Sequence, residues 1–449
     1  MTSEHPDPSP PAPVADRWVV QPGRPLVGEL RVPGDKSISH RALLFGSLTT
    51  GSCQVIGFLP GGDCLATLGC VRGLGIRVDQ LGATEVVVHG RGLGGLQAPT
   101  EPLDCVRSGT TMRLLAGLLA GQPFASTLVA APQLARRPMA RVAAPLALLG
   151  AQVTTTDGRP PLQITGTPLH GAEVTLPVAS AQLKSAVLLA GLFATGETIV
   201  HEPGPSRDHS ERLLAALGAD LAVQGPTVRL RPGGSLRPFS LAVPGDPSSA
   251  AFPLVAALLV PGSRLAVTGV GINPTRTGLF DVLQRMGARL TIVPTGEQGG
   301  EPVGTLWAEP GGSLRGVEVG GETVVRAIDE LPLLAVAACH AVGVTVLRDA
   351  AELRVKETDR IETIVTELRR LGAAITACPD GFVVHGPCPL QGGTVTSHGD
   401  HRLAMALTVA GLGAAGPVTV EGTACVGDSF PGFFSALAAV GALEGDCRS

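Results

Sequence analysis

One pattern of polar and apolar residues occurs six times along the chain. Each copy opens with a short polar stretch, and a long apolar stretch that predicts a buried helix follows directly. The copies are GDKSISHRALLFGSL from Gly34, RSGTTMRLLAGLLAG from Arg107, SAQLKSAVLLAGLFA from Ser180, GDPSSAAFPLVAALL from Gly245, IDELPLLAVAACHA from Ile328 and GDHRLAMALTVAGL from Gly399. Their starts lie 73, 73, 65, 83 and 71 residues apart.

A second pattern alternates with the first: a helix that ends at a glycine, followed by an apolar strand. The glycines are Gly75, Gly150, Gly218, Gly287, Gly372 and Gly441. A glycine just past a helix adopts the left-handed conformation at little cost, which makes it a common helix end. The segments EVVVHG, LQITG and FVVHG predict further strands. We therefore predict six units of about seventy residues, each with two helices and several strands.

Three segments interrupt or flank these units. PTGEQGGEPVG (294–304) falls in the longest spacing and is interpreted as an insertion loop. LPLLAVAACHAVGVTVL (331–347) contains a histidine and a VGV break, so it predicts a core helix and a strand rather than a membrane span. MTSEHPDPSPPAPVADR at the N-terminus has five prolines and no apolar core, which indicates a disordered tail (1–18) rather than a signal peptide.

Composition excludes several classes of protein. The chain has 449 residues, of which 44% are hydrophobic and 16% charged, so it is long and apolar enough for two or more folded domains. A net charge of −4, 3% aromatic residues and no tyrosine argue against a nucleic-acid-binding protein. The nine cysteines are scattered without a CxxC pair, which indicates core residues in a reducing cytoplasm and neither a disulfide nor a metal framework.

Cations near the predicted helix starts point to an anionic ligand. Serine, threonine and aspartate at a helix start act as caps, and capping alone is the favoured interpretation of GDPSSAAF. Capping does not explain Lys36, Arg41, Arg113, Lys184 and Arg402, because the helix dipole disfavours positive charge there. A bound anion would stabilise them. We expect these helix starts to converge on one anion-binding cleft.

Further charged groups extend this site. The chain has 34 lysines and arginines, of which only three are lysines (Lys36, Lys184 and Lys356). All three lie in polar, motif-like segments, which reflects either chance or a requirement for a compact ammonium group there. ARRPMARV supplies Arg136 and Arg137, and PSRDHSERLL supplies Arg207 and Asp208. LRVKETDRI places Lys356, Glu357 and Arg360 within about one helical turn, as a site or as a solvated helix face with ion pairs.

The acids embedded among these cations suit proton transfer. They are Asp329, Glu357 and Asp400. A substrate with phosphate and carboxylate groups suits the arginines, which bind both groups with two parallel hydrogen bonds. The sequence contains no P-loop, no Gly-x-Gly-x-x-Gly after a strand, no Gly-x-Ser-x-Gly and no zinc-ligand spacing.

Eight motifs, in this order, closely resemble the 5-enolpyruvylshikimate-3-phosphate synthase family. They are PGDKSISHRALLFGSL, SGTTMRLLAGL, SAQLKSAVLLAGL, SRDHSERLL, PGDPSSAAF, LRVKETDRI, DHRLAMAL and SFPGFF, and the resemblance runs from about residue 19 to the C-terminus. It implies an α/β fold with two similar domains, each of three βαβαββ units (an inside-out α/β barrel). The chain would cross twice, giving domains of residues 34–243 and of 19–33 plus 244–449, with the active site between them.

The resemblance also implies a reaction and its residues. The enolpyruvyl group of phosphoenolpyruvate moves to the 5-hydroxyl of shikimate 3-phosphate through a tetrahedral intermediate, without a metal or organic cofactor, in a monomer. Asp329 resembles the base, Glu357 the acid, and Lys36 a residue that faces both substrates. The residues implied to bind shikimate 3-phosphate are Lys36, Ser37, Arg41, Ser180, Ala181, Gln182, Arg207, Asp329 and Lys356; those implied to bind phosphoenolpyruvate are Lys36, Gly109, Arg137, Gln182, Arg360 and Arg402.

Three positions bear on substrate contacts. Arg107 replaces the family's usual asparagine before SGTT, and Asp428 replaces a lysine found in some members before SFP. Gly109 is the small residue at which some members carry alanine and tolerate glyphosate, so its presence predicts inhibition by glyphosate.

Two alternatives to this function are an enzyme of the same chemistry and a protein of another functional class. UDP-N-acetylglucosamine enolpyruvyl transferase shares fold and chemistry, but its cysteine-bearing loop is absent and KS rather than KN follows the first strand. A non-catalytic module of the same fold would be expected to have lost Asp329, Glu357 or the arginines, and all are present.

Overall fold

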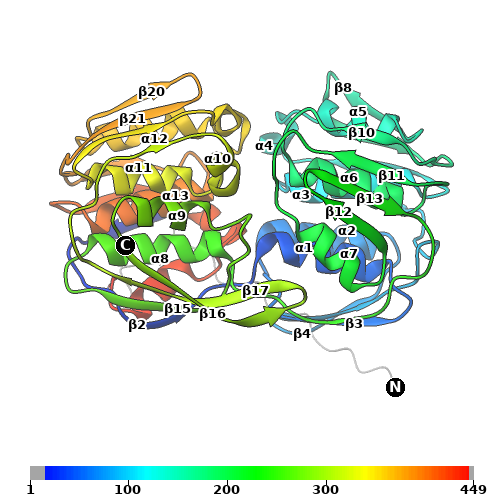
Figure 1. Cartoon of the computed structure of the whole chain (residues 1–449), viewed down its shortest axis with the longest axis horizontal. Coiled ribbons are helices and arrows are strands. Elements are labelled where there is room, and N and C mark those ends of the chain that lie inside the picture. Colours follow the sequence, from blue (N-terminus) through cyan, green and yellow to red (C-terminus); the bar gives the residue numbers. More distant parts are fainter. Residues whose placement is uncertain (1–15, 444–449) are drawn as a thin grey trace.

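The computed structural model describes residues 16–443 and shows two lobes side by side (Figure 1). Two separate hydrophobic cores define them. The core of the central lobe runs from Ile38 to Val243, and the core of the terminal lobe combines Val20–Val32 with residues 250–443. Most of the predicted disordered tail (1–18) lies outside the described residues. The prediction is wrong for Arg17 and Trp18, which belong to strand β1 and pair with β23.

Three small sheets form the outside of the central lobe. Their strand orders are β14(Ser240–Ala242)–β3(Ser52–Ile56)–β5(Glu85–His89)–β4(Val78–Gly82), β6(Leu103–Asp104)–β7(Ala125–Val129)–β9(Arg159–Thr165)–β8(Gln152–Thr156) and β10(Glu173–Thr175)–β11(Thr198–His201)–β13(Thr227–Arg231)–β12(Asp220–Gln224). In each sheet the first two strands are parallel and the other neighbours are antiparallel.

The terminal lobe repeats this arrangement. Its sheets are β2(Val27–Arg31)–β15(Arg264–Gly271)–β17(Glu301–Glu309)–β16(Arg289–Gln298), β18(Glu318–Val319)–β19(Gly343–Leu347)–β21(Gly381–Gly386)–β20(Ile375–Cys378) and β1(Arg17–Val20)–β23(Val418–Glu421)–β22(Gly393–Thr396). The described strands thus form six similar small sheets, which confirms the predicted α/β class with six units.

All six predicted helix starts are confirmed. The helices are α1 (Lys36–Ser47), α3 (Gly109–Ala120), α6 (Ala181–Gly191), α8 (Pro247–Leu259), α11 (Leu331–Cys339) and α13 (His401–Leu412). They are buried over most of their length, as apolar helices with no polar face must be. Gly117 lets α3 approach α6, because a Cβ there would lie 2.0 Å from the carbonyl oxygen of Ala186.

The six predicted helix-ending glycines are confirmed too, since each has a positive φ between 79° and 89°. They follow α2 (Gly62–Gly73), α5 (Ala140–Ala147), α7 (His209–Ala216), α9 (Gly278–Arg285), α12 (Arg360–Arg370) and α14 (Phe433–Ala439). The remaining described helices are short: α4 (Pro132–Ala135), α10 (Glu322–Ala327), and the 3₁₀ turns η1 (Ala351–Val355) and η2 (Thr423–Asp428).

The chain passes between the lobes at two adjacent segments. The backbone N–H of Asp35 donates to the carbonyl of Pro244 at 2.8 Å, and that of Asp246 donates to Pro33 at 2.9 Å. The buried guanidinium of Arg276 contacts both aspartates, at 2.6 and 2.9 Å. Because β14 pairs with β3 and β2 pairs with β15, each lobe is completed by a strand next to the crossing.

The interpretation of residues 294–304 as an insertion loop is wrong. Strands β16 and β17 continue through the segment as an antiparallel hairpin, paired as far as Gln298 and Glu301. Gly299 and Gly300, both with positive φ, form the turn, and a bulge after Pro294 accommodates the proline. The hairpin extends from the terminal lobe to the central lobe (Figure 1).

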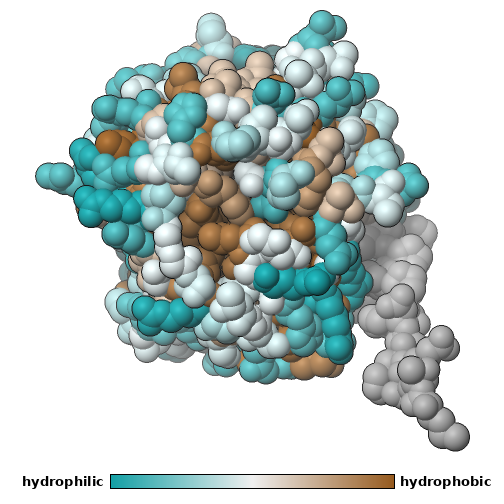
Figure 2. Space-filling view, turned by 90° about the vertical axis from the view of Figure 1, so that its right-hand side faces the viewer, coloured by the Kyte–Doolittle hydropathy of each residue, from teal (hydrophilic) through white to brown (hydrophobic). Residues whose placement is uncertain are grey.

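The outer face of the central lobe mixes surface types: hydrophilic residues surround a group of hydrophobic residues near its centre (Figure 2). Within residues 16–443, none of the helices combines the length and the apolar character needed to cross a bilayer.

Candidate active site

The predicted site residues line a cleft between the lobes. The cleft encloses about 1280 Å³, part of it open to solvent. Its walls include Lys36, Ser37, Arg41, Gly109, Arg137, Ser180, Ala181, Gln182, Arg207, Asp329, Lys356 and Glu357. The starts of α1, α3 and α6 meet there, as the cations at the helix starts had indicated. Arg360 and Arg402 lie buried behind the wall rather than on it.

Asp329 is surrounded by three cations. Its carboxylate is 2.5 Å from Arg207 Nη2, 3.4 Å from Lys356 Nζ and 3.5 Å from Arg360 Nη1. Burial alone would raise its pKa, but Lys356, Arg207 and further arginines hold the pKa well below the usual range. Asp329 is therefore ionised before a substrate arrives, and Arg207 reaches it from the opposite lobe.

Glu357 has a similar environment. It lies 3.2 Å from Arg137 Nη1 of the central lobe and 2.7 Å from Arg360 Nη2. Burial would raise its pKa, but Arg360 and Arg137 hold the pKa well below its ordinary value. Lys356, Glu357 and Arg360 were expected within one helical turn, and this prediction is wrong in one respect. Lys356 and Glu357 precede α12, which begins at Arg360 with Asp359 as its cap. The loop lets both side chains face the cleft.

Lys36 is held by an acid that the sequence did not reveal. Its Nζ lies 2.9 Å from Asp63 at the start of α2, and both side chains are mostly buried. Burial would lower the pKa of Lys36, but Asp63 outweighs this and the pKa is raised. The ammonium group is therefore charged and its position is fixed.

Gln182 connects two helix starts. It accepts from Arg113 Nη1 at 2.5 Å and donates to Thr110 Oγ1 at 2.9 Å. Arg41 is held by Ser185 and Ser210, each at 2.7 Å. Burial lowers the pKa of Arg41 to about 10, so its guanidinium stays charged at neutral pH.

Several buried cation N–H groups near the cleft have no acceptor in the described part of the chain. They are Nη1 of Arg402 and Nε of Arg113 and Arg137. A buried donor left unpaired costs about 1–3 kcal/mol, and more when charged. A bound anion would remove that cost, so these groups support an anion site independently of the sequence motifs.

Asp400 does not reach the cleft. It is fully buried, caps α13 through the N–H of Arg402, and pairs with Arg360 Nε at 2.8 Å. Its role is to orient Arg360, so the interpretation of Asp400 as a proton-transfer acid is not supported. The capping interpretation of GDPSSAAF is confirmed, since Asp246 accepts from the N–H of Ser248.

Lys184 also departs from the prediction. Its ammonium lies 2.6 Å from Glu202 and 2.6 Å from Glu211, and all three side chains are buried inside the central lobe. It is absent from the cleft wall. The lysine at the start of α6 is therefore part of the lobe's interior, and the acids that neutralise it belong to the same lobe.

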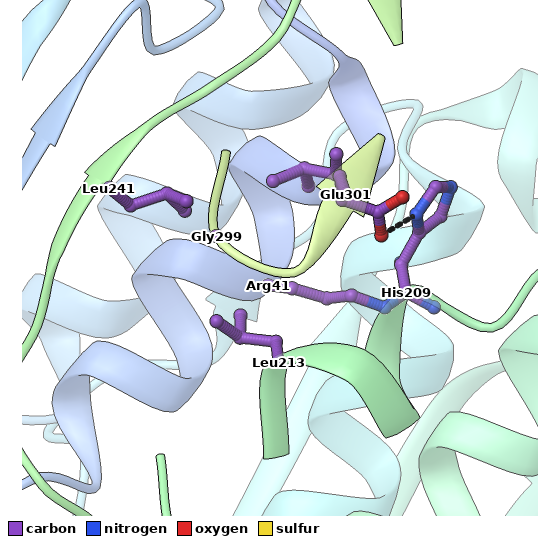
Figure 3. A pocket seen from close by; sticks show the side chains of 7 residues that line it. Arg41, His209, Leu213, Leu241, Gly299 and Glu301 are labelled. Atoms are coloured by element: carbon purple, nitrogen blue, oxygen red, sulfur yellow. Dashed lines mark hydrogen bonds and ion pairs between the residues drawn. The ribbon is translucent and has the colours of Figure 1, made fainter. Parts of the chain in front are cut away.

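Arg41 also lines a second, small cavity together with His209 and Glu301 (Figure 3). The hairpin tip at Gly299 lies between Leu241 and α7, and Glu301 Oε1 is 2.7 Å from His209 Nδ1. Asp208, His209 and Glu301 could together offer ligands to a cation. However, the amide of Asn273 already donates to Asp208 at 2.7 Å and to Glu301 at 2.8 Å, so these acids are satisfied by hydrogen bonds.

A second opening meets the cleft at Arg137, Lys356 and Glu357. Arg136 and Arg107 lie on its wall. Arg136, which the sequence placed beside the site, is exposed there rather than within the cleft.

Comparisons with known proteins agree with this geometry. The model of the family EPSP synthase (3-phosphoshikimate 1-carboxyvinyltransferase) matches residues 20–437. The 3-phosphoshikimate 1-carboxyvinyltransferase of Geobacter sp. (strain M21) is 51% identical over 424 residues, 94% of this chain and 98% of the relative. That of Bacillus subtilis (strain 168) is 49% identical over 418 residues, 92% and 96% of the two chains.

Solved structures show the same relationship. EPSP synthase from Acinetobacter baumannii superposes with a TM-score of 0.85 at 44% identity, covering 95% of this chain and 98% of that one. The enolpyruvyl transferase NikO from Streptomyces tendae has a TM-score of 0.79 at 21% identity over the same shares, which shows the shared fold. The chain belongs to the EPSP synthase family.

Proposed function

We propose that this chain transfers the enolpyruvyl group of phosphoenolpyruvate to the 5-hydroxyl of shikimate 3-phosphate and releases phosphate. One observation carries the proposal: two mostly buried carboxylates, Asp329 and Glu357, face one cleft, and each is surrounded by cations from both lobes. Such a site can bind two anionic substrates and still move protons between them.

Asp329 acts as the base for the acceptor hydroxyl. In the unliganded site Arg207 and Lys356 engage its carboxylate. When the acceptor's phosphate engages Arg207, Asp329 loses part of that stabilisation and its pKa rises, since burial is then less opposed. Asp329 can then take the proton of the 5-hydroxyl as the oxygen attacks C2 of the donor.

Glu357 acts as the acid that protonates the donor's methylene carbon. The arginines that depress its pKa, Arg360 and Arg137, are the groups that the donor's carboxylate and phosphate would engage. Their transfer to the substrate raises the pKa of Glu357, which favours its protonated form. The tetrahedral intermediate then collapses: a proton of the new methyl group returns to Glu357, the C–O bond to phosphate breaks, and phosphate leaves with the proton that Asp329 had taken.

The remaining contacts divide the cleft into two ends. Ser37, Arg41, Ser180 and Ala181 form the acceptor end, with Gln182, Arg207 and Lys356 beside them, whereas Gly109 and Arg137 form the donor end, with Arg360 and Arg402 buried behind it. Lys36 faces both. Its pairing with Asp63 keeps the ammonium charged and in place for the phosphate that leaves.

The domain organisation and cellular setting are proposed on related grounds. The two cores support domains of residues 34–243 and of 19–33 plus 244–449, closing on substrate by movement at the paired crossings. The family resemblance implies that the chain acts as a monomer. The eight described cysteines are free, which suits the reducing cytoplasm.

Phosphate release from the purified chain, given both substrates, tests the proposal. We expect turnover that requires both, and a loss of about 10²–10⁴-fold in kcat for Asp329→Ala. Asp220→Ala, at an exposed aspartate that begins strand β12 on the outer sheet of the central lobe, serves as the matched control. No release, or release that Asp329→Ala leaves unchanged, would refute the assignment, and UDP-N-acetylglucosamine would then be tested as the acceptor.

A further inference from the structure

The two unusual residues near the site, Arg107 and Asp428, contact each other. Arg107 lies in the loop before α3 of the central lobe, and Asp428 ends η2 of the terminal lobe. Arg107 Nη2 is 3.2 Å from Asp428 Oδ1. The two positions are 321 residues apart, so the pairing connects the lobes at the edge of the cleft.

The surroundings of Asp428 place its charge at the donor end. The start of α2 packs against it through two glycines: a Cβ at Gly62 would lie 2.8 Å from Asp428 Oδ1, and one at Gly61 would lie 2.6 Å from its carbonyl oxygen. Besides Arg107, the charged groups that act on its carboxyl are Asp63, Lys36 and Glu357. All three border the donor end of the cleft.

A carboxylate in this position opposes the binding of an anion. Arg107 offsets that charge incompletely, because it makes one contact and its side chain is 42% exposed, against 16% for Asp428. Burial raises the pKa of Asp428 to about 6; Arg107 lowers it and Asp63 raises it further. The charge of Asp428 therefore depends on Arg107, a partly exposed side chain that can also be hydrated by solvent.

We propose that Arg107 and Asp428 are a specificity-determining pair for the enolpyruvyl donor. Asp428 weakens the binding of small anions beside Lys36, and Arg107 sets how much of that repulsion the donor experiences. The inference rests on the proposed function, because the donor is the anion that would bind at this end.

The sign of each variant's effect tests the pair. We expect Arg107→Gln to raise the KM for phosphoenolpyruvate about three- to tenfold and Asp428→Asn to lower it by a similar factor, as a single charge across a partly hydrated cleft would do. The double variant should return to near the wild-type value. The KM for shikimate 3-phosphate and kcat should stay within about twofold of wild type.

A simple latch between the lobes gives a different pattern. If the pair merely held the lobes together, Arg107→Gln and Asp428→Asn would shift the donor KM in the same direction, and this result would overturn the proposal. Arg77→Gln and Asp79→Asn are matched controls, because that ion pair (2.8 Å) lies near β4, on the outer sheet of the central lobe. They should leave both KM values unchanged.

Lowering the pH tests the same charge without a substitution. Asp428 becomes neutral as the pH falls through about 6, so the donor-KM ratio of wild type to Asp428→Asn should approach one. The donor's own titration cancels in that ratio. A ratio that stays constant from pH 8 to pH 5.5 would contradict the proposal.

Calorimetry keeps this inference separate from the proposed function. Titration of the wild type and the three variants with phosphoenolpyruvate or inorganic phosphate requires no turnover. The same order of affinities should appear: Asp428→Asn tightest, wild type and the double variant next, Arg107→Gln weakest. Equal affinities in all four proteins would refute the role of the pair, even if the wild type is an active enzyme. If the affinities follow the expected order but the wild type shows no turnover, the proposed reaction alone is refuted.

Discussion

Replacement of Lys184 by methionine tests whether this lysine stabilises the interior of the central lobe or belongs to the candidate active site. Lys184 is 2% exposed, and its two partners, Glu202 and Glu211, are 5% and 6% exposed. Methionine has a similar volume but leaves two buried carboxylates without a counter-charge. Removal of one partner from a buried ion pair typically costs about 3–5 kcal/mol.

This loss should be visible in the melting temperature. For a domain of 150–250 residues, each kcal/mol corresponds to about 2–4 °C, so the central lobe of Lys184→Met should melt about 6–20 °C lower. Scanning calorimetry measures the shift directly. The variant that also carries Glu202→Gln and Glu211→Gln should recover part of the loss, because no charge is then buried unpaired.

The stability of Lys184→Met should also depend on pH, and the direction follows from the pKa of Glu211. Burial raises the pKa of Glu211 even though Lys184 opposes it. Without the lysine, the pKa of the folded state rises further above the unfolded value. A carboxyl of this kind destabilises the fold more as the pH increases, so the deficit of Lys184→Met should be larger at pH 8 than at pH 5.5.

Kinetics would reveal an error in this reasoning. Below its melting temperature, Lys184→Met should keep substrate KM values within about threefold of wild type, because the ammonium does not line the cleft. An unchanged melting temperature together with a KM raised tenfold or more would mean that Lys184 belongs to the site.

Three further substitutions test the site and the hairpin. Glu357→Gln keeps one acceptor oxygen for the flanking arginines but cannot deliver a proton, so kcat should fall about 10²–10⁴-fold in steady-state assays, and a loss below tenfold would contradict the acid role. Gly109→Ala would place a methyl group 3.0 Å from Nη1 of Arg137. The donor KM should rise, and the inhibition constant for glyphosate should rise more; equal inhibition of both proteins would refute that reasoning. Glu301→Gln should cost about 1–3 kcal/mol by weakening the buried contact to His209, and an unchanged melting temperature would argue against a structural role for the hairpin.

Most of the fold could be predicted from local features of the sequence. A polar cap before an apolar stretch and a glycine after the helix both act within a few residues, so each helix start and helix end could be located without knowledge of the rest of the chain. The hairpin of β16 and β17 could not be found this way. Its glycines and glutamates resemble a loop, and its tip is stabilised by contacts with Leu241 and His209 of the other lobe.

The sequence did not reveal which residues pair with the buried charges. The sequence showed that Lys36 and Lys184 both stand near helix starts, but not that Asp63 would face one and two glutamates the other. Which acid lies opposite a cation is decided by packing between segments far apart in the chain. Arg276, which contacts both interlobe crossings, was missed for the same reason.

The origin of each acid explains why the cleft can respond to a substrate. Around it, arginines of the central lobe pair with acids of the terminal lobe; the pairs are Arg207–Asp329, Arg137–Glu357, Arg141–Glu352 and Arg107–Asp428. The cation of Lys184, in contrast, is neutralised within its own lobe. An anionic substrate must therefore compete with the terminal lobe for the arginines of the central lobe. When the substrate engages Arg207 or Arg137, Asp329 or Glu357 loses a counter-charge and the pKa of that carboxyl rises. Substrate binding would thus supply the change in proton affinity that the proposed base and acid require, because each acid and its arginine come from opposite lobes.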